Sequence, residues 1–92
     1  MTRTKERIDQ RSGTGLGAPW HVIVLNDDHN TFEGVAAALS TVIGISFPEG
    51  MAFANRIHAS GQALVWSGHR EVAEHYWKGL RQRGLTMAPL ET

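Results

Sequence analysis

The sequence predicts an α+β fold in the order β-α-α-β-α-β, with three helices packed on a small three-stranded, mostly antiparallel sheet. Three observations carry this prediction. Residues 20–25 form an apolar, β-branched run of strand length. Two segments of helical periodicity follow it, and a second apolar run and a third helical segment come after them. A chain of 92 residues can bury one core but not the two lobes of a larger enzyme.

The first strand is expected to end at residue 25, because the Asn-Asp-Asp cluster at 26–28 supplies side chains that favour turns. The first helix is expected to begin at Phe32, since apolar residues recur at positions 32, 35, 36, 39, 42 and 43. Asn30 or Thr31 is placed to accept hydrogen bonds from its first free amides. Gly44 should end it.

A second helix is predicted from the segment Ser-Phe-Pro-Glu at residues 46–49. Ser46 and Glu49 have the spacing of a capping box, and Pro48 lies in the first turn, where its missing amide does no harm. Gly61 should end this helix. On a helical wheel His58 shares a stripe with Met51 and Ala54, so we expect it on the apolar side of the helix.

The rest of the fold is expected from the last third of the chain. Residues 62–66 predict a short second strand, and residues 69–83 predict a third helix with cations near its C-terminal end, where the helix dipole favours them. Gly84 should end this helix. Residues 85–90 are expected to return as an edge strand, a position that tolerates Pro89.

Two segments of different composition divide the chain. Residues 1–18 have few large apolar side chains and end in a Gly-rich stretch, which predicts a flexible N-terminal arm. The folded domain is expected over residues 19–92. We find no apolar run of the length that a signal peptide or a membrane span needs, so a cytoplasmic location away from membranes is expected.

Charge and cysteine content exclude several kinds of partner. Nine basic and nine acidic residues cancel, and the basic residues are spread along the chain instead of lying on one element. This distribution lacks the basic stripe of a nucleic-acid-binding protein. The chain has no cysteine, and therefore neither a disulfide framework nor a thiolate metal site.

The polar cluster after the first strand is the feature most informative about function. Asn26, Asp27 and Asp28 would form a rim of hydrogen-bond acceptors beside a core that includes Val24 and Val35. An acidic rim over an apolar floor suits a ligand with one cationic and one apolar end, such as the N-terminal residue of a peptide. The cluster is also explained by turn formation alone, and a lone helix histidine such as His58 is more often structural.

Four segments together resemble the ClpS adaptor family over residues 19–91, and they occur in that family's order and spacing. They are Trp20 to Asp28, then Glu33 with Val35, then Ile57-His58-x-x-Gly61, and finally Glu71-Val72-Ala73-Glu74. The resemblance implies an adaptor, not an enzyme, that needs no cofactor. Such an adaptor binds the bulky hydrophobic N-terminal residue of proteins that carry an N-degron. It then delivers them to a Clp AAA+ unfoldase and its peptidase.

The resemblance also implies roles for particular residues. Asn26, Asp27 and His58 would contact the substrate α-amine, while Asp28 and Asn30 would support the turn and the peptide backbone. The apolar pocket would be lined by Phe32, Val35, Ala54 and Ile57. Contacts with the N-domain of the unfoldase would fall to Glu71, Glu74 and Tyr76. We expect a monomer, since an adaptor has no need to self-associate.

The chain departs from the family pattern at three of these positions. Relatives commonly carry methionine where this chain has Phe32 and Ala54, so one change fills space in the pocket and the other removes it. The resemblance therefore carries over no ranking of Phe, Leu, Trp and Tyr as first residues. Some relatives use a lysine on the unfoldase-facing surface where this chain has Tyr76, which leaves the identity of the unfoldase open.

The chemistry of an α-amine matches the proposed residues. A protonated amine offers three donors, and the Asn26 amide oxygen, the Asp27 carboxylate and a neutral His58 ring would supply three acceptors. Two alternatives remain at this point. One is a docking module on a Clp-type unfoldase that does not read N-termini. The other is a small metal-dependent hydrolase using Asp27, Asp28, His29 and His58, although their spacing matches no common metal motif.

Overall fold

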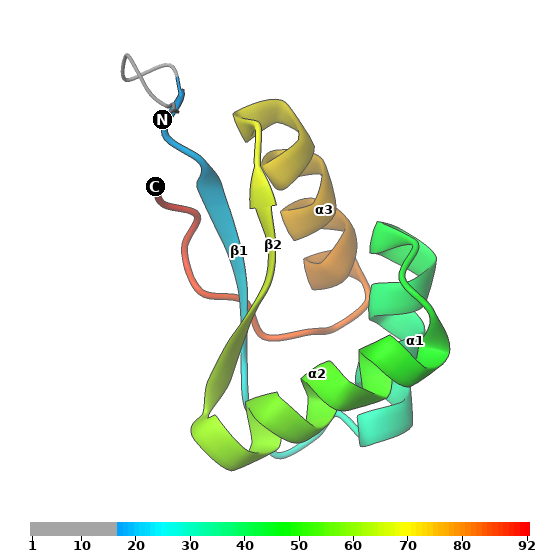
Figure 1. Ribbon diagram of the computed structural model, residues 1–92. Coiled ribbons are helices and arrows are strands. Elements are labelled where there is room, and N and C mark those ends of the chain that lie inside the picture. The colour runs from blue at the N-terminus through cyan, green and yellow to red at the C-terminus, as the bar shows by residue number, and fades with distance from the viewer. Residues whose placement is uncertain (1–16) are drawn as a thin grey trace, which may run out of the picture.

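The computed structural model describes residues 17–92, and these contain five helices and strands in an α+β arrangement (Figure 1). In chain order they are β1 (Trp20–Leu25), α1 (Phe32–Ile43), α2 (Phe47–Ser60), β2 (Gln62–Gly68) and α3 (Arg70–Gln82). The three predicted helices and the first two predicted strands are therefore confirmed, with β2 two residues longer than expected. The predicted arm, residues 1–18, lies outside the described residues except for its last two.

The sheet has two strands. β1 and β2 pair antiparallel, from Trp20 opposite Gly68 to Leu25 opposite Gln62, with an irregular register between Val22 and Ile23. The chain after α3 lies along the free edge of β1, and α1 and α2 pack together near the lower end of the sheet in Figure 1. The chain therefore leaves β1, forms two helices and returns beside β1.

The predicted third strand is not confirmed. The chain after α3 runs beside β1 (Figure 1), but it forms only isolated bridges, between His21 and Glu91 and between Val24 and Met87. Two features oppose a regular ladder. Pro89 has no N–H to donate, and the carbonyl oxygen of Ala88 accepts a hydrogen bond from the Trp77 indole at 2.7 Å.

The helix ends follow the sequence signals. The Thr31 hydroxyl accepts a hydrogen bond from the Gly34 amide at 2.9 Å, which makes Thr31 and not Asn30 the cap of α1. The capping box of Ser46 and Glu49 forms in both directions. After α3 the chain turns through Gly84, whose φ of 92° lies in the left-handed region that glycine tolerates.

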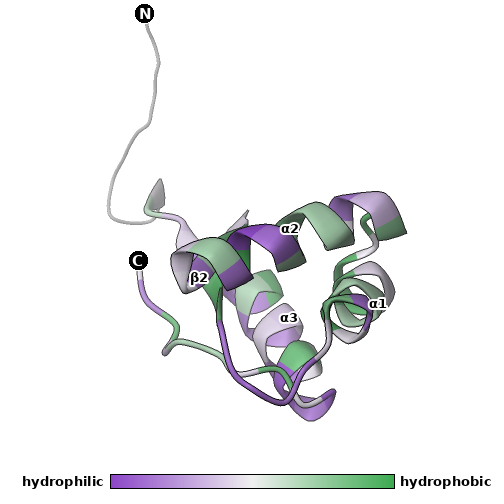
Figure 2. Ribbon diagram, turned by 90° about the horizontal axis from the view of Figure 1, so that it is seen from below, coloured by the Kyte–Doolittle hydropathy of each residue, from purple (hydrophilic) through white to green (hydrophobic). Residues whose placement is uncertain are grey.

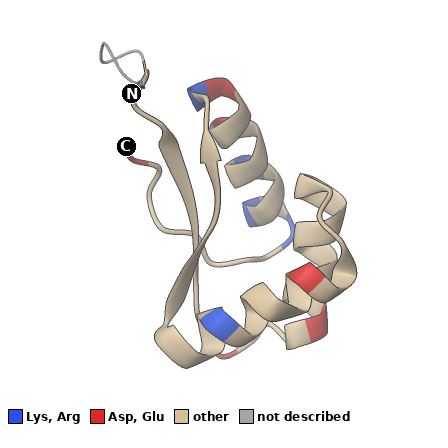
Figure 3. Cartoon of the chain, viewed as in Figure 1, with Lys and Arg blue, Asp and Glu red and all other residues tan. Residues whose placement is uncertain are grey.

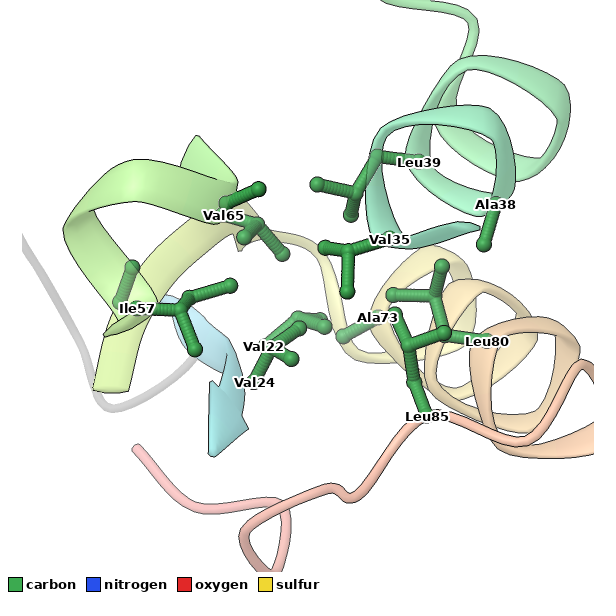
Figure 4. Close-up of a cluster of buried hydrophobic side chains, with 12 residues drawn as sticks. Val22, Val24, Val35, Ala38, Leu39, Ile57, Val65, Ala73, Leu80 and Leu85 are labelled. Atoms are coloured by element: carbon green, nitrogen blue, oxygen red, sulfur yellow. The ribbon is translucent and has the colours of Figure 1, made fainter. Parts of the chain in front are cut away.

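The core lies between the sheet and the three helices, and Figure 4 shows its side chains pointing toward one another. The strands contribute alternate residues, as a half-buried sheet requires. Figure 2 shows that each helix carries both apolar and polar residues, as expected for helices that bury one face. The core consists of Val22, Val24, Val35, Ala38, Leu39, Ala54, Ile57, Ala63, Val65, Ala73, Leu80 and Leu85.

Candidate functional site

The turn after β1 is held against the end of α2. The backbone amide of Asn26 donates a hydrogen bond to the carbonyl oxygen of Gly61 at 2.9 Å. Gly61 closes α2, and its φ of 90° is one that β-branched or bulky residues rarely adopt. This contact brings the acidic turn close to the last turn of α2, which carries His58.

Asp27 is the most heavily bonded side chain in this turn. Its Oδ1 accepts hydrogen bonds from the backbone amides of His29 at 3.1 Å and Asn30 at 2.8 Å. Its Oδ2 accepts from the Asn30 side-chain amide at 2.7 Å and from the Thr86 hydroxyl at 2.8 Å. The Asn30 amide also donates to the carbonyl oxygen of Gly84 at 2.9 Å. The turn is thereby tied to the chain that follows α3.

These bonds favour the charged form of the carboxyl. Burial of Asp27 would by itself raise its pKa, but the hydrogen bonds from Asn30, Thr86 and the His29 amide outweigh this effect and hold the pKa well below its usual range. The His29 ring nitrogen Nε2 lies 3.5 Å from Asp27 Oδ2 and adds an attraction when the ring is protonated. Asp27 is therefore a fixed negative charge throughout the physiological pH range.

A hollow opens beside this turn, between β1, α1, α2 and the chain after α3. Of the nine residues that the sequence placed at the α-amine, the peptide backbone or the pocket, all except Asp28 line it. Asp28 is exposed and lies outside. The full lining is Val24, Leu25, Asn26, Asp27, Asn30, Phe32, Val35, Ala54, Ile57, His58 and Leu85.

The hollow has a polar mouth and an apolar floor. Asn26 and His58 are exposed, whereas Val35, Ala54 and Ile57 are buried. The rings of Phe32 on α1 and His58 on α2 lie 5.2 Å apart between centroids and are inclined at 59°, so they pack against each other beside the mouth. Within residues 17–92, the side chains of Asn26 and His58 make no hydrogen bonds, which leaves their acceptor atoms available to a ligand.

The hollow is small. Its volume is about 50 Å³, whereas a cavity that encloses benzene measures about 150 Å³. The half-buried Phe32 ring lies beside the exposed His58 ring in this lining. A phenyl or indole group needs more room than a hollow of this size provides.

The residues predicted to contact the unfoldase are not part of the hollow. Glu71, Glu74 and Tyr76 lie on α3, and Figure 3 shows that the charges of α3 lie away from the turn that follows β1. Glu71 is exposed, while Glu74 accepts a hydrogen bond from the Arg70 guanidinium at 3.2 Å. The Tyr76 ring packs edge-on against Trp66, with centroids 5.2 Å apart.

Leu85 and Thr86 were missed as site residues by the sequence reasoning. Residues 85–90 were predicted only to form an edge strand, whereas Leu85 lines the hollow and Thr86 bonds to Asp27. The alternation of apolar Leu85 and polar Thr86 is the signal that could have assigned them to different surroundings.

Two kinds of structure are not found in residues 17–92. No three side chains of His, Asp or Glu gather in a way that could hold a metal ion. No helix there has both the length and the apolar character needed to cross a membrane.

The family model described as "ATP-dependent Clp protease adaptor protein ClpS" matches residues 17–91. The chain belongs to the ClpS family. It is therefore an adaptor of the ATP-dependent Clp protease and not an enzyme. The resemblance drawn from the sequence is confirmed.

Two curated ClpS adapter proteins illustrate the relationship. The one from Nostoc sp. is 51% identical over 73 residues, which cover 78% of this chain and 75% of the relative. The one from Thermosynechococcus vestitus is 49% identical over 73 residues, which cover 78% of each chain. The fold is also similar to that of Agrobacterium tumefaciens ClpS2 bound to L-phenylalaninamide. That similarity has a TM-score of 0.71 at 27% identity and covers 80% of this chain and 98% of the other.

Proposed function

We propose that this ClpS family member binds the free N-terminal residue of substrate proteins and delivers them to a Clp AAA+ unfoldase. One observation carries the proposal. Asn26, Asp27 and His58, hereafter the amine site, line the same hollow as the buried side chains of Val35, Ala54 and Ile57. An ammonium group at the mouth and an apolar side chain on the floor would both be satisfied there.

The amine site offers an ammonium one negative charge and two acceptors that make no other hydrogen bond within residues 17–92, while the Asp27 oxygens already accept four. Asp27 supplies a carboxylate that stays ionised, and the amide oxygen of Asn26 and a neutral ring nitrogen of His58 supply acceptors. The ligand of the related A. tumefaciens ClpS2, L-phenylalaninamide, has a free α-amine next to an apolar side chain. A ligand of this chemical class carries the two groups that the hollow would accept, an amine for its mouth and an apolar side chain for its floor.

The small volume of the hollow bears on the first residue of the substrate. Burying a large apolar side chain contributes about 1.5–3 kcal/mol, but an aromatic side chain needs more room than the hollow of about 50 Å³ provides, so neighbouring side chains such as Phe32 would have to move. A leucine side chain is smaller and needs less movement. We therefore expect Leu to be bound at least as well as Trp.

Delivery requires a second surface. We assign it to α3, where Glu71 is exposed and where Glu74 and Tyr76 lie along the same helix, with the N-domain of the unfoldase as the partner. Because α3 does not line the hollow, substrate and unfoldase could be bound at the same time. A monomer suffices for both contacts, and a cytoplasmic location fits such a partner.

The test is the affinity for a fluorescent peptide that begins with Leu, compared with its N-acetylated twin. Acetylation removes the charge and leaves the acceptors of the amine site unpaired, so we expect at least about a 100-fold loss. His58→Ala should weaken binding of the free peptide, and His75→Ala, an exposed histidine on α3, is the matched control. Equal affinity for the two peptides would contradict the proposal and favour a docking module that does not read N-termini.

A further inference from the structure

We propose that Thr86 is a positioning residue of the amine site, and that it makes the segment of residues 84–91, hereafter the C-terminal segment, part of substrate capture. The inference rests on the proposed function, because it concerns how Asp27 is presented to the substrate amine. The sequence offered no such role for Thr86, which lies 59 residues from Asp27 in the chain.

Thr86 is held at both its backbone and its side chain. Its carbonyl oxygen accepts a hydrogen bond from the Leu25 amide at 2.8 Å, which fixes it beside the last residue of β1. Its hydroxyl donates to Asp27 Oδ2 at 2.8 Å, and the residue is half-buried. The hydroxyl therefore reaches Asp27 from a rigid position, and it does not line the hollow itself.

The orientation of the Asp27 carboxylate depends on this bond. The torsion that turns a carboxylate about its Cβ–Cγ bond has broad minima, so hydrogen bonds set its angle. Oδ1 is held by two amides of its own turn, whereas both strong donors to Oδ2, Asn30 and Thr86, depend on the C-terminal segment. Asn30 depends on it through its own bond to the Gly84 carbonyl.

The two tethers differ in what they can do. The Asn30 amide group is shared between Asp27 and Gly84, so it holds the turn and the C-terminal segment together. The Thr86 hydroxyl has one proton, and it donates that proton to Asp27 alone among the described contacts. Removing the hydroxyl should therefore loosen the carboxylate while the Asn30 tether still holds the C-terminal segment in place.

The experiment compares Thr86→Val, which keeps the shape and removes the hydroxyl, with Thr86→Ser, which keeps the hydroxyl. Thr41→Val on the exposed side of α1 is the control. We expect Thr86→Val to weaken the free Leu peptide about five- to tenfold, as befits one charge-assisted bond, and to leave the weak acetylated peptide unchanged. Thr86→Ser and Thr41→Val should bind like the wild type.

A second measurement separates positioning from a general loss of structure. Carboxyl carbon NMR should show the Asp27 pKa rising in Thr86→Val and staying low in Thr86→Ser. Where Thr86→Val does not fold, Thr86→Ala serves in its place. Wild-type affinity in the Val variant, or equal weakening of both peptides, would overturn the role of Thr86 alone. A wild-type protein that does not distinguish the two peptides would overturn the proposed function and the role of Thr86 with it.

Discussion

Replacing Asp27 with asparagine tests whether this carboxylate holds the turn together. The variant keeps the shape of the side chain but replaces one of its two oxygens with an NH₂ group. That NH₂ group then faces two hydrogen-bond donors, either the two backbone amides at Oδ1 or the Asn30 amide and the Thr86 hydroxyl at Oδ2. At least one hydrogen bond is then lost, and the others change from charged to neutral acceptors. Hydrogen bonds to charged groups contribute about 1.5–3 kcal/mol and neutral ones about 0.5–1.5 kcal/mol, so we expect a loss of about 2–4 kcal/mol.

This loss is large for a domain of this size, whose free energy of unfolding is expected to be about 4–11 kcal/mol. Urea unfolding followed by tryptophan fluorescence would measure it, because Trp20, Trp66 and Trp77 are all partly buried. Asp28→Asn is the matched control, since Asp28 is exposed and accepts none of the hydrogen bonds found in residues 17–92. A loss below about 0.5 kcal/mol for Asp27→Asn, or an equal loss for Asp28→Asn, would refute the reasoning.

The same variant makes a prediction about pH. The pKa of Asp27 is lower in the folded protein than in the unfolded chain, where it is about 3.9. Its contribution to stability is therefore complete above the unfolded pKa and declines as pH falls toward the folded pKa. The gap in unfolding free energy between wild type and Asp27→Asn should be constant from pH 7 to 5 and narrow below about pH 4. A gap that stayed the same down to pH 3 would show that the carboxylate charge does not contribute.

Four further outcomes are expected. His58→Ala should weaken a free-amine peptide more than its acetylated twin, as fluorescence anisotropy would show. Ala54→Met should fill the small hollow and weaken Trp-initiated peptides more than Leu-initiated ones, measured as a ratio of Kd values. Gly50→Ala would place a Cβ 2.8 Å from the Ala36 carbonyl oxygen, and a urea melt should show a loss of about 1–3 kcal/mol. Glu71→Lys should weaken binding to the isolated N-domain of the unfoldase without changing peptide affinity.

The helices were predictable because their signals are local. The capping box of Ser46 and Glu49 joins residues three positions apart, and the glycines that end α1 and α2 adopt left-handed φ angles of 89° and 90°. Such features depend on sterics and hydrogen bonds within one turn, which the sequence displays directly. The helical spacing of apolar residues likewise identified the buried face of α1, with Val35 and Leu39 in the core.

The prediction of a third strand was wrong because strand pairing by residues 85–90 depends on groups outside that segment. Residues 85–90 have a composition that suits an edge strand. However, the Trp77 indole donates a hydrogen bond to the Ala88 carbonyl oxygen in place of a donor from a neighbouring strand. Indole and carbonyl lie 11 residues apart, and their meeting requires α3 to be packed first. No periodicity in the strand itself could show this competition.

The candidate site shows the same division between local and distant causes. The acceptors at positions 26–27, the helix histidine and the apolar floor were predicted, and the structure brings all of them to one hollow. The surroundings of Asp27 could not be predicted, because Thr86, which donates to Asp27, and Gly84, which accepts from Asn30, come from the far end of the chain. The size of the hollow could not be predicted from the sequence either, since it depends on how the Phe32 ring packs against His58.

The Asp27 carboxylate and the apolar floor are held largely by different parts of the chain. Recognition of the substrate amine and recognition of its first side chain should therefore vary independently. The donors that hold Asp27 come from its own turn and the C-terminal segment, whereas most of the buried floor comes from Val24 on β1, Val35 on α1, and Ala54 and Ile57 on α2, with Leu85 as the one residue of the C-terminal segment in the lining. Substitutions at sites more than about 7–10 Å apart that share no partner usually have additive effects to within about 0.5 kcal/mol. A change at Ala54 should therefore alter the preference among first residues without altering the ratio of free to acetylated peptide. A change at Thr86 should alter the ratio of free to acetylated peptide without altering the preference among first residues. In the Ala54→Met, Thr86→Val double variant, the fold-changes in Kd of the two single variants should multiply.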